Sequence, residues 1–337
     1  MSRLSGRTYT HDKPPSVISY ACVGGKKEGE GPMRECFDKI SDDPYFTTES
    51  FEKAESEMQK QAILLSLRKI GKKPENIDFM LGGDLLNQCV GTSYSSRDMN
   101  IPFLGIYGAC STMAEGLLIS SLLVSGGVGK NVIASTSSHF CTAERQYRFP
   151  IDYGNQRTPT AQWTATAAGA IIVSSSGQGP YVRGATIGSI VDLGVTDINN
   201  MGAAMAPAAC DTIKAFFDDT KKKPEDFDLV VTGDLGLVGS SLLYQLLSNE
   251  GYNIKPRHKD CGLMIYDVKG QDMHAGGSGC GCAASMLTGY FLPKLKEGRI
   301  KNILFVATGA LMSPTVNQQG ESIPSVAHAV WISSERS

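Results

Sequence analysis

Cys110 is the residue of this chain whose type and position are best suited to chemistry. It lies in the segment Gly108-Ala109-Cys110-Ser111-Thr112, between a predicted strand at 102–107 and a predicted helix at 112–125 that carries almost no charge. The positive end of a helix dipole stabilises a thiolate, which favours a nucleophilic role. The sequence is equally compatible with a plain buried thiol, which is the commonest role of a free cysteine.

A glycine-rich turn at 276–282 takes the equivalent place in the second half of the chain. Cys280 and Cys282 are one residue apart in it, and His274 is close by. This spacing is not that of a zinc knuckle and no second ligand pair accompanies it, so we predict no metal site. A phosphate cradle would be possible in principle, but the P-loop and dinucleotide spacings are absent. The pattern favours a turn of small residues where two backbones cross.

Asp84 and Asp234 each stand in a Gly-Asp-Leu sequence directly after a predicted strand. Ligand clefts in α/β sheets open at the carboxyl ends of strands, so either aspartate is a candidate binding residue. The same side chain can instead accept hydrogen bonds from the first amides of the next helix, and we expect at least one of the two to be structural. Asn87 and Gln88, one turn further on, offer neutral hydrogen-bonding groups.

A long segment from His139 to Trp163 carries Arg145, Arg148 and Arg157. Arginines can hold a carboxylate ligand through two parallel hydrogen bonds, but a surface ion pair or a subunit contact is the commoner role for any one of them. Long loops are more often functional than structural. We therefore expect this segment to form a wall of a pocket or part of a subunit interface.

The elements that position these residues occur twice. The segment 72–85 recurs 150 residues later at 222–235: Lys-Lys-Pro-Glu opens both copies and Gly-Asp-Leu closes both. Two further pairs keep the same order, 127–135 with 298–306 and 168–174 with 327–333, and about twelve extra residues of the first half fall between them. A repeat of domain size indicates two similar halves rather than a solenoid, and we place them at 1–176 and 177–337.

Hydrophobic periodicity predicts alternating helices and strands. We expect helices at 50–70, 112–125, 208–217, 241–248 and 283–295, and strands at 17–23, 77–81, 132–135, 166–175, 182–188, 229–232, 303–307 and 327–333. Continuous apolar strands of this kind indicate an α/β fold with largely parallel sheets covered on both faces. The polar segment 1–15 resembles a loose arm.

Composition narrows the function further. The chain has 337 residues, a net charge of −2 and a pI near 6.2, which gives no electrostatic footprint for nucleic acid. Its nine cysteines follow no framework spacing, which favours free thiols in a reducing compartment. No apolar run is long enough to span a membrane, and we expect no signal peptide, so membrane association would come through partners.

A pseudo-twofold α/β chain with a cysteine at a buried helix N-terminus resembles the thiolase-like fold. This resemblance implies two related α/β halves in a layered α-β-α-β-α arrangement, and commonly a homodimer. The first half is similar to beta-ketoacyl synthase III enzymes, in which that cysteine takes an acyl group. Those enzymes also use a histidine and an asparagine, whose places here fall near Gly233-Asp234 and Gly279-Cys280. Cys110 matches the nucleophile position, but the histidine and asparagine positions do not match. The resemblance therefore implies a nucleophile position without its two catalytic partners.

Over nearly its whole length the chain also resembles the stage V sporulation protein AD family of spore-forming bacteria. The carrying stretches are 83–88, 108–112, 136–139, 142–146, 205–209, 260–266 and 275–280. The resemblance implies a non-enzymatic protein that binds pyridine-2,6-dicarboxylate (dipicolinate), with calcium possible in the bound ligand, for uptake into the developing spore. It further implies a place in the forespore, peripheral to the inner membrane, beside membrane-embedded proteins of the same operon.

Taken together, these patterns give one site hypothesis and two alternatives. Dipicolinate is flat and twice negative, so it needs donors from the helix start and the glycine-rich turn, and a cation such as calcium where it meets aspartate. The candidate ligand-binding residues are Asp84, Asn87, Cys110, Ser111, His139, Asp234, Gly277 and Cys280. One alternative is an acyl-thioester transferase or hydrolase with Cys110 as nucleophile. A third hypothesis is a scaffold subunit whose cleft is vestigial.

Overall fold

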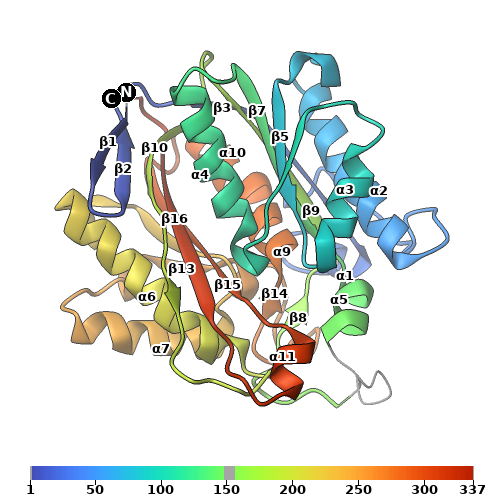
Figure 1. Cartoon of the computed structure of the whole chain (residues 1–337), viewed down its shortest axis with the longest axis vertical. Coiled ribbons are helices and arrows are strands. Elements are labelled where there is room, and N and C mark those ends of the chain that lie inside the picture. Colours follow the sequence, from blue (N-terminus) through green and yellow to red (C-terminus); the bar gives the residue numbers. More distant parts are fainter. Residues whose placement is uncertain (1, 148–155, 337) are drawn as a thin grey trace.

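The computed structural model describes residues 2–147 and 156–336 (Figure 1). Each half of the chain contributes five principal strands. Those of the first half are β3 (Ser16–Gly24), β5 (Phe79–Gly83), β6 (Phe103–Gly105), β7 (Asn131–Ser138) and β9 (Ala167–Ser174). Those of the second half are β10 (Tyr181–Thr186), β12 (Leu229–Thr232), β13 (His258–Asp260), β15 (Asn302–Ala310) and β16 (Ser325–Ser333).

The strand order shows the duplication directly. The strands run β13-β12-β15-β16-β10-β3-β9-β7-β5-β6, so the order outward from β3 in one half repeats the order outward from β10 in the other. In this order the two innermost strands, β3 and β10, are joined by one residue pair, Tyr181 with Ser16. The division that we placed after residue 176 falls in the connection between β9 and β10, and its reading as two domains stays a prediction.

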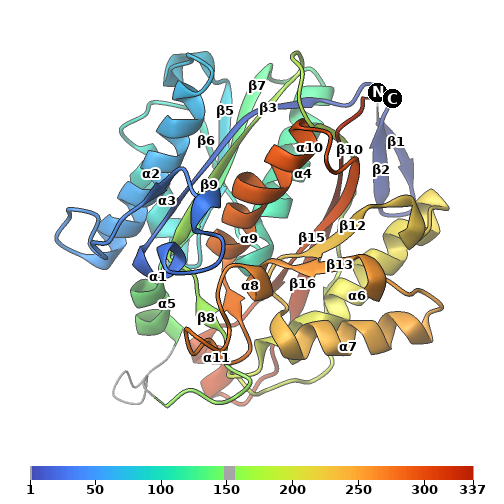
Figure 2. The same cartoon turned by 180° about the vertical axis from the view of Figure 1, so that it is seen from behind.

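Helices lie in three layers around the strands. The outer layers are α2 (Phe51–Arg68) with α3 (Val90–Ser96) on the first half, and α6 (Met201–Thr220) with α7 (Gly236–Asn249) on the second. Between them, α4 (Thr112–Ser125) contacts strands of both halves, and α9 (Cys280–Met286) packs on β7 and β9. Figure 2 shows the outer helices on opposite sides of the molecule, with α9 and α10 (Leu292–Lys296) between them. This is the predicted α-β-α-β-α arrangement.

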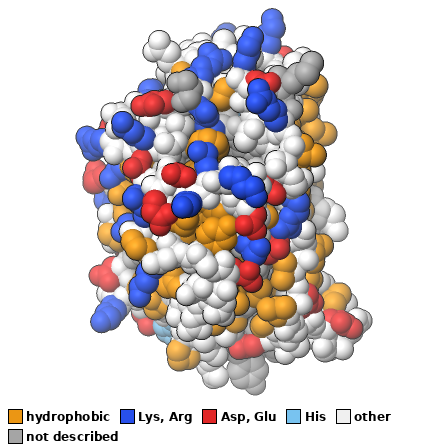
Figure 3. Space-filling view, turned by 90° about the vertical axis from the view of Figure 1, so that its left-hand side faces the viewer, with side chains coloured by type: hydrophobic (Ala, Val, Ile, Leu, Met, Phe, Trp, Pro, Cys, Tyr) orange, Lys and Arg blue, Asp and Glu red, His pale blue; other side chains and the backbone are white. Residues whose placement is uncertain are grey.

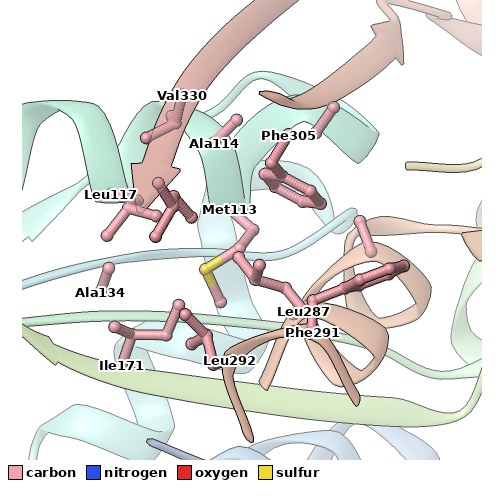
Figure 4. Packing of buried hydrophobic residues seen from close by; sticks show 14 of the residues in the cluster. Met113, Ala114, Leu117, Ala134, Ile171, Leu287, Phe291, Leu292, Phe305 and Val330 are labelled. Atoms are coloured by element: carbon pink, nitrogen blue, oxygen red, sulfur yellow. The ribbon is translucent and has the colours of Figure 1, made fainter. Parts of the chain in front are cut away.

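The central layer is held by apolar packing on all sides of α4. Met113 and Leu117 are fully buried and lie among side chains from both sheets and from α9–α10, including Phe305, Leu287 and Phe291 (Figure 4). A helix without a polar face can be stable only when it is covered all round, which explains why 112–125 carries so little charge. A large core of this kind removes any need for disulfides, and all nine cysteines are free.

Two expectations about the sheets and the N-terminus are wrong. The sheet is mixed rather than largely parallel: β3 with β9, β7 with β9, and β15 with β16 are antiparallel, because β9 and β16 return along the centre of each half. The segment 1–15 is not a loose arm but a hairpin, β1 (Ser2–Ser5) and β2 (Thr8–His11), which pairs with β10. Its buried Tyr9 donates a hydrogen bond of 2.8 Å to the Leu118 carbonyl of α4.

The remaining short elements surround the ends of the strands. They are α1 (Lys26–Gly29), β4 (Lys39–Ile40), α5 (Phe140–Tyr147), β8 (Trp163–Thr164), β11 (Ile190–Val191), α8 (Cys261–Met264), β14 (Gly277–Ser278) and α11 (Pro314–Gln318). The expected long loop thus begins with a helix, α5. On the face that carries the hairpin, basic and acidic side chains are interspersed (Figure 3), in keeping with the small net charge of −2.

Candidate functional site

A pocket opens beside Cys110 where the two halves meet. Its enclosed volume is about 50 Å³, smaller than usual small-molecule sites, and the space rises to about 580 Å³ only when the open mouth is included. The walls come from both halves and are mostly apolar. The lining residues are Leu85, Ala109, Cys110, Ala143, Glu144, Tyr147, Thr164, Ile198, Asn199, Met201, Ser278, Ala310 and Met312.

Cys110 is positioned by a strained turn. Ala109 has a φ of +50°, a conformation that non-glycine residues rarely adopt, and the turn Ala109–Ser111 leads directly into α4. Strain of this kind is typical of functional sites and persists only where the surroundings enforce it. The turn holds the Cys110 sulfur at the pocket wall, 3.9 Å from the Ser278 hydroxyl oxygen, with the residue 5% exposed.

Asp234 lies behind this pair and is fully buried. Its Oδ2 accepts hydrogen bonds from the Ser278 hydroxyl at 3.0 Å and from the Gly279 amide at 2.8 Å. Within the part of the chain that the structure describes, its Oδ1 has no hydrogen-bond partner. Asp234, Ser278 and Cys110 therefore form one connected group, of which Ser278 and Cys110 reach the pocket.

Burial dominates the electrostatics of this group. Desolvation, followed by the nearby Asp234 charge, raises the pKa of the Cys110 thiol well above its usual value of 9.0. Desolvation also raises the pKa of Asp234 to about 7, although the Cys110 thiol and the Gly279 amide pull it down. The sequence left a dipole-stabilised thiolate and a plain buried thiol equally open for Cys110, and these shifts favour the protonated thiol.

The other aspartate of the repeat, Asp84, is a structural residue. Its carboxylate accepts hydrogen bonds from the Leu86 amide at 2.9 Å and from the Thr92 amide and hydroxyl, each at 2.7 Å. Glu55, also fully buried, lies close enough for the Asp84 charge to help burial raise its pKa to about 8. One carboxyl group of such a pair stays protonated near neutral pH.

Asp260 plays the corresponding structural part in the second half. Its two oxygens accept from the amides of Leu235, Gly236 and Leu263. Asp234 therefore does not perform the capping role that Asp84 performs. It contacts Ser278 at the site instead, behind the pocket wall. The sequence analysis missed Asp260; its position before a short helix, α8, was the signal that could have found it.

Four further candidates lie near the site without lining the pocket. Ser111 donates to the Gly108 carbonyl at 2.7 Å, and Cys280 donates its thiol to the Ser137 carbonyl at 2.9 Å. The Gly277 carbonyl accepts from Gln162 at 2.9 Å. His139 is buried, and its Nε2 bonds to the Pro44 carbonyl at 2.9 Å. These contacts use the groups internally, and a ligand-binding role for them stays a prediction.

Asn87 lies on the surface outside the pocket, in two shallower depressions beside it. The arginines of the long segment are engaged elsewhere. Arg145 pairs with Glu52, and Arg157 binds Asp272 at 2.6 Å. Arg148 falls outside the described residues. Among the pocket-lining residues that the structure describes there is no lysine or arginine, and the one charged side chain is Glu144.

Of the lining residues, only Cys110 was a predicted site residue. The segment 139–163, which we expected to form a pocket wall or part of a subunit interface, does line the pocket through α5, including Tyr147, whereas Met312 from the segment before α11 and Thr164 from β8 were not foreseen. The hydroxyl of Tyr147 donates to the Leu85 carbonyl and lies 3.1 Å from that of Tyr107, which fixes the pocket wall. No sequence signal distinguishes Met312 and Thr164, because their place in the pocket depends on how the loops of both halves converge.

Comparison with known proteins decides the family. The model of the family described as Stage V sporulation protein AD (SpoVAD) matches residues 5–333. The chain belongs to this family. A curated relative, stage V sporulation protein AD of Bacillus subtilis (strain 168), is 44% identical over 329 residues, covering 97% of each chain.

Solved structures show that the SpoVAD-family chain has a thiolase-like fold. A 3-oxoacyl-[acyl-carrier-protein] synthase III from Aquifex aeolicus matches with a TM-score of 0.57 at 15% identity, covering 95% of this chain and 99% of its own. An OleA variant from Xanthomonas campestris matches with a TM-score of 0.60 at 13% identity, covering 96% and 99%. At these identities the likeness establishes the fold alone and carries no information about a shared activity.

Among residues 2–147 and 156–336, no three His, Cys, Asp or Glu side chains are grouped so that they could hold a metal ion. No helix in the same residues is long and apolar enough to cross a bilayer.

Proposed function

We propose that the pocket beside Cys110 binds dipicolinate without covalent turnover, as part of its uptake into the developing spore. The family is named for sporulation and not for a reaction. The observation that carries the proposal is the group Cys110–Asp234–Ser278, in which the thiol stays protonated and a carboxyl group takes the place where related synthases use a histidine. A negative charge there opposes the enolate and oxyanion chemistry of condensation.

The pocket also favours a particular form of the ligand. Dipicolinate alone brings two negative charges to a site that contains Glu144 and Asp234 and to which the described residues contribute no cation. Burying the two charges of the ligand without compensation is costly, so we expect the ligand to enter with its charge neutralised. Calcium carried by dipicolinate would do this, because calcium prefers oxygen ligands such as carboxylates. In this proposal the ion is part of the cargo and not a resident cofactor.

The partners follow from the same proposal. Uptake requires passage through a membrane, and the described residues contain no spanning helix. We therefore propose that the chain works at the forespore inner membrane through membrane-embedded proteins of the same operon.

A titration tests the ligand. Isothermal calorimetry with dipicolinate, with and without equimolar calcium, should give saturable binding that is stronger with calcium. Benzene-1,3-dicarboxylate, which lacks the ring nitrogen, serves as the control ligand. Cys110→Leu, which fills the pocket, should abolish binding, whereas Cys141→Ala, outside the pocket on α5, should leave it intact. Equal binding by Cys110→Leu and the wild type would place the ligand elsewhere.

One observation favours a second function. Cys110 stands on a strained turn at a helix start, and the structural neighbours include acyl-chain enzymes. An acyl-thioester transferase or hydrolase would form a thioester at Cys110. Intact-protein mass spectrometry after incubation with acyl-CoA distinguishes the two, because an acyl mass on Cys110 would replace the binding proposal with this one.

A further inference from the structure

A short ladder of two strands connects the protein surface to the pocket. Strands β8 and β14 run parallel, pairing Trp163 with Gly277 and Thr164 with Ser278. The Ala165 amide continues the ladder by donating to the Ser278 carbonyl at 2.9 Å. Thr164 and Ser278, at the inner end, both line the pocket. Any loosening of the ladder therefore shifts two ligand-facing hydroxyl groups.

The outer end of the ladder is fastened by side chains. Arg157 grips Asp272 twice, through its side chain at 2.6 Å and its carbonyl at 2.8 Å. Asp272 and His274 both have left-handed backbones, with φ of +57° and +52°. Such conformations are unfavourable for residues other than glycine, so the contacts of these side chains must hold them in place.

The contacts of His274 require a particular protonation state. Its Nδ1 lies 2.7 Å from the Thr158 carbonyl oxygen, and its Nε2 lies 3.1 Å from Asp272 Oδ1. A carbonyl and a carboxylate only accept hydrogen bonds, so both ring nitrogens must carry a proton. A neutral imidazole has one N–H and would turn a lone pair toward one of these oxygens. Only the imidazolium makes both contacts.

We propose that His274 is a proton-operated latch that regulates ligand binding at the Cys110 pocket. In the protonated form it ties the turn 272–276 to the segment 157–161 and keeps the ladder closed. Loss of the proton leaves the ring a single N–H, so one of its two contacts is lost. The outer end is then held by the Ala275 amide bond to the Ala161 carbonyl at 3.0 Å and by the Arg157–Asp272 pair, and Thr164 and Ser278 are less firmly held. Histidine is suited to this role because it changes charge near pH 6.5. The ligand-binding part of this inference rests on the proposed function.

Among the residues that the structure describes, few charged groups lie near the latch. Asp272 faces His274 directly, and Arg157 faces Asp272 from the other segment. Lys27 of α1 lies 5.4 Å from the Trp163 ring, on the same segment as Arg157. In the preceding turn, Asp267 accepts the amides of Lys269 and Gly270 and so is occupied locally.

The fluorescence of Trp163 measures the state of the latch in the absence of ligand. It stacks on Phe140 with ring centroids 3.8 Å apart, and the Arg157 guanidinium lies 5.1 Å from its ring. The chain has two tryptophans, so Trp331→Phe leaves Trp163 as the single emitter. In this background, acrylamide quenching of Trp163 should fall about twofold as the pH is lowered from about 8 to about 5.5, across the range where histidine titrates.

His274→Gln in the same background should remove this change, because glutamine carries no titrating proton. The other four histidines remain in that variant, so a pH response that persists would come from them and would overturn the latch. Asp272→Asn should also remove the response, since an amide can donate to a neutral imidazole.

Calorimetry then connects the latch to the pocket. Calcium dipicolinate should bind about threefold tighter at the lower pH in the Trp331→Phe protein and equally at both pH values after His274→Gln. The same pH dependence in both proteins would contradict regulation by His274. A Trp163 response that depends on His274, together with no dipicolinate binding by any protein, would support the latch and refute the proposed ligand.

Discussion

Two opposing effects act on the Cys110 thiol. The start of α4 offers a positive dipole, which favours a thiolate by about 1 kcal/mol or less in ordinary settings. Burial and the Asp234 carboxyl group act the other way and raise the pKa of the thiol well above 9.0. Desolvation of a fully buried group shifts a pKa by several units, so it outweighs the dipole. The residue is consequently placed like a nucleophile but kept in its unreactive form.

Asp234→Asn should make Cys110 more reactive. Removing the adjacent negative charge lowers the pKa of the thiol, and one pKa unit would raise the thiolate fraction about tenfold at a fixed pH below that pKa. Alkylation of Cys110 by iodoacetamide at pH 8, followed by peptide mass spectrometry, measures the effect. Asp98→Asn, on the exposed surface, is the control. An unchanged rate in Asp234→Asn would show that access and not charge limits the thiol.

The sequence identified the candidate residues but could not tell which of them are structural and which lie at the site. Cys110 and the two Gly-Asp-Leu aspartates are visible as patterns, and Cys110 does line the pocket. Asp84 and Asp234 look alike in the chain, yet one caps amides and the other faces a thiol. The difference arises from Asp260, which is distant in sequence and takes over capping in the second half. Which aspartate takes the capping role depends on tertiary contacts, which the sequence does not display.

At the level of elements, the sequence predicted the bounds of a helix or strand correctly where a single pattern governs the segment. The bounds predicted for α4 and β12 agree with the structure, because an uncharged helix and a short apolar strand have no competing pattern. Helix α6 begins seven residues earlier than the expected Ala208, at Met201, and contains Pro207. The hairpin β1–β2 was missed because its polar residues hide the alternation of buried Tyr9 and His11.

Strand β6 suggests where a homodimer would form. It is the outermost strand of the first half, and its Phe103 and Leu104 are 36% and 49% exposed, with Tyr107 at 44% just beyond it. An apolar edge strand with unpaired backbone groups invites pairing with another strand. Antiparallel pairing of β6 with its own copy about a twofold axis would extend the sheet across both protomers.

Leu104→Lys should therefore yield a monomer. A lysine at the centre of the paired edge places two like charges against each other across the axis. Light scattering after gel filtration measures the mass, with Leu237→Lys as control because Leu237 is 51% exposed on α7, away from this edge. A wild-type protein that is already monomeric, or a dimer that survives Leu104→Lys, would contradict this interface.

At the scale of the whole molecule, the duplication brings two similar halves together at the pocket. The two halves contribute different side chains to it. Both halves end their central strands at the same junction, where the Cys110 turn of one half meets β14 and β15 of the other. The repeat in the sequence predicted two similar halves, and the thiolase-like resemblance implied their layered arrangement. The segment 139–163, where the halves differ in length, was expected as a pocket wall, and its helix α5 does line the pocket. The wall residues before α11 gave no such signal, because they have no partner in the repeat.

Gly309 shows how closely the halves depend on each other at this junction. It lies in β15, and a Cβ atom there would stand 1.9 Å from the Gly108 carbonyl oxygen and 3.1 Å from Ala109 Cβ. Backbone atoms cannot move aside as a flexible side chain can, so Gly309→Ala must displace the turn that carries Cys110. Overpacking of this kind costs about 1–3 kcal/mol in the free energy of unfolding.

We expect Gly309→Ala to lower the melting temperature and also to weaken binding of calcium dipicolinate, because the displaced turn moves Cys110 relative to Ser278. Differential scanning calorimetry and titration calorimetry on the same preparation measure both effects. Gly105→Ala is the matched control, since its added Cβ meets only Phe103 ring carbons at 3.4 Å and beyond. Reduced stability with unchanged affinity would mean that the ligand does not sense the Cys110 turn, and the binding site would then have to lie away from the junction of the halves.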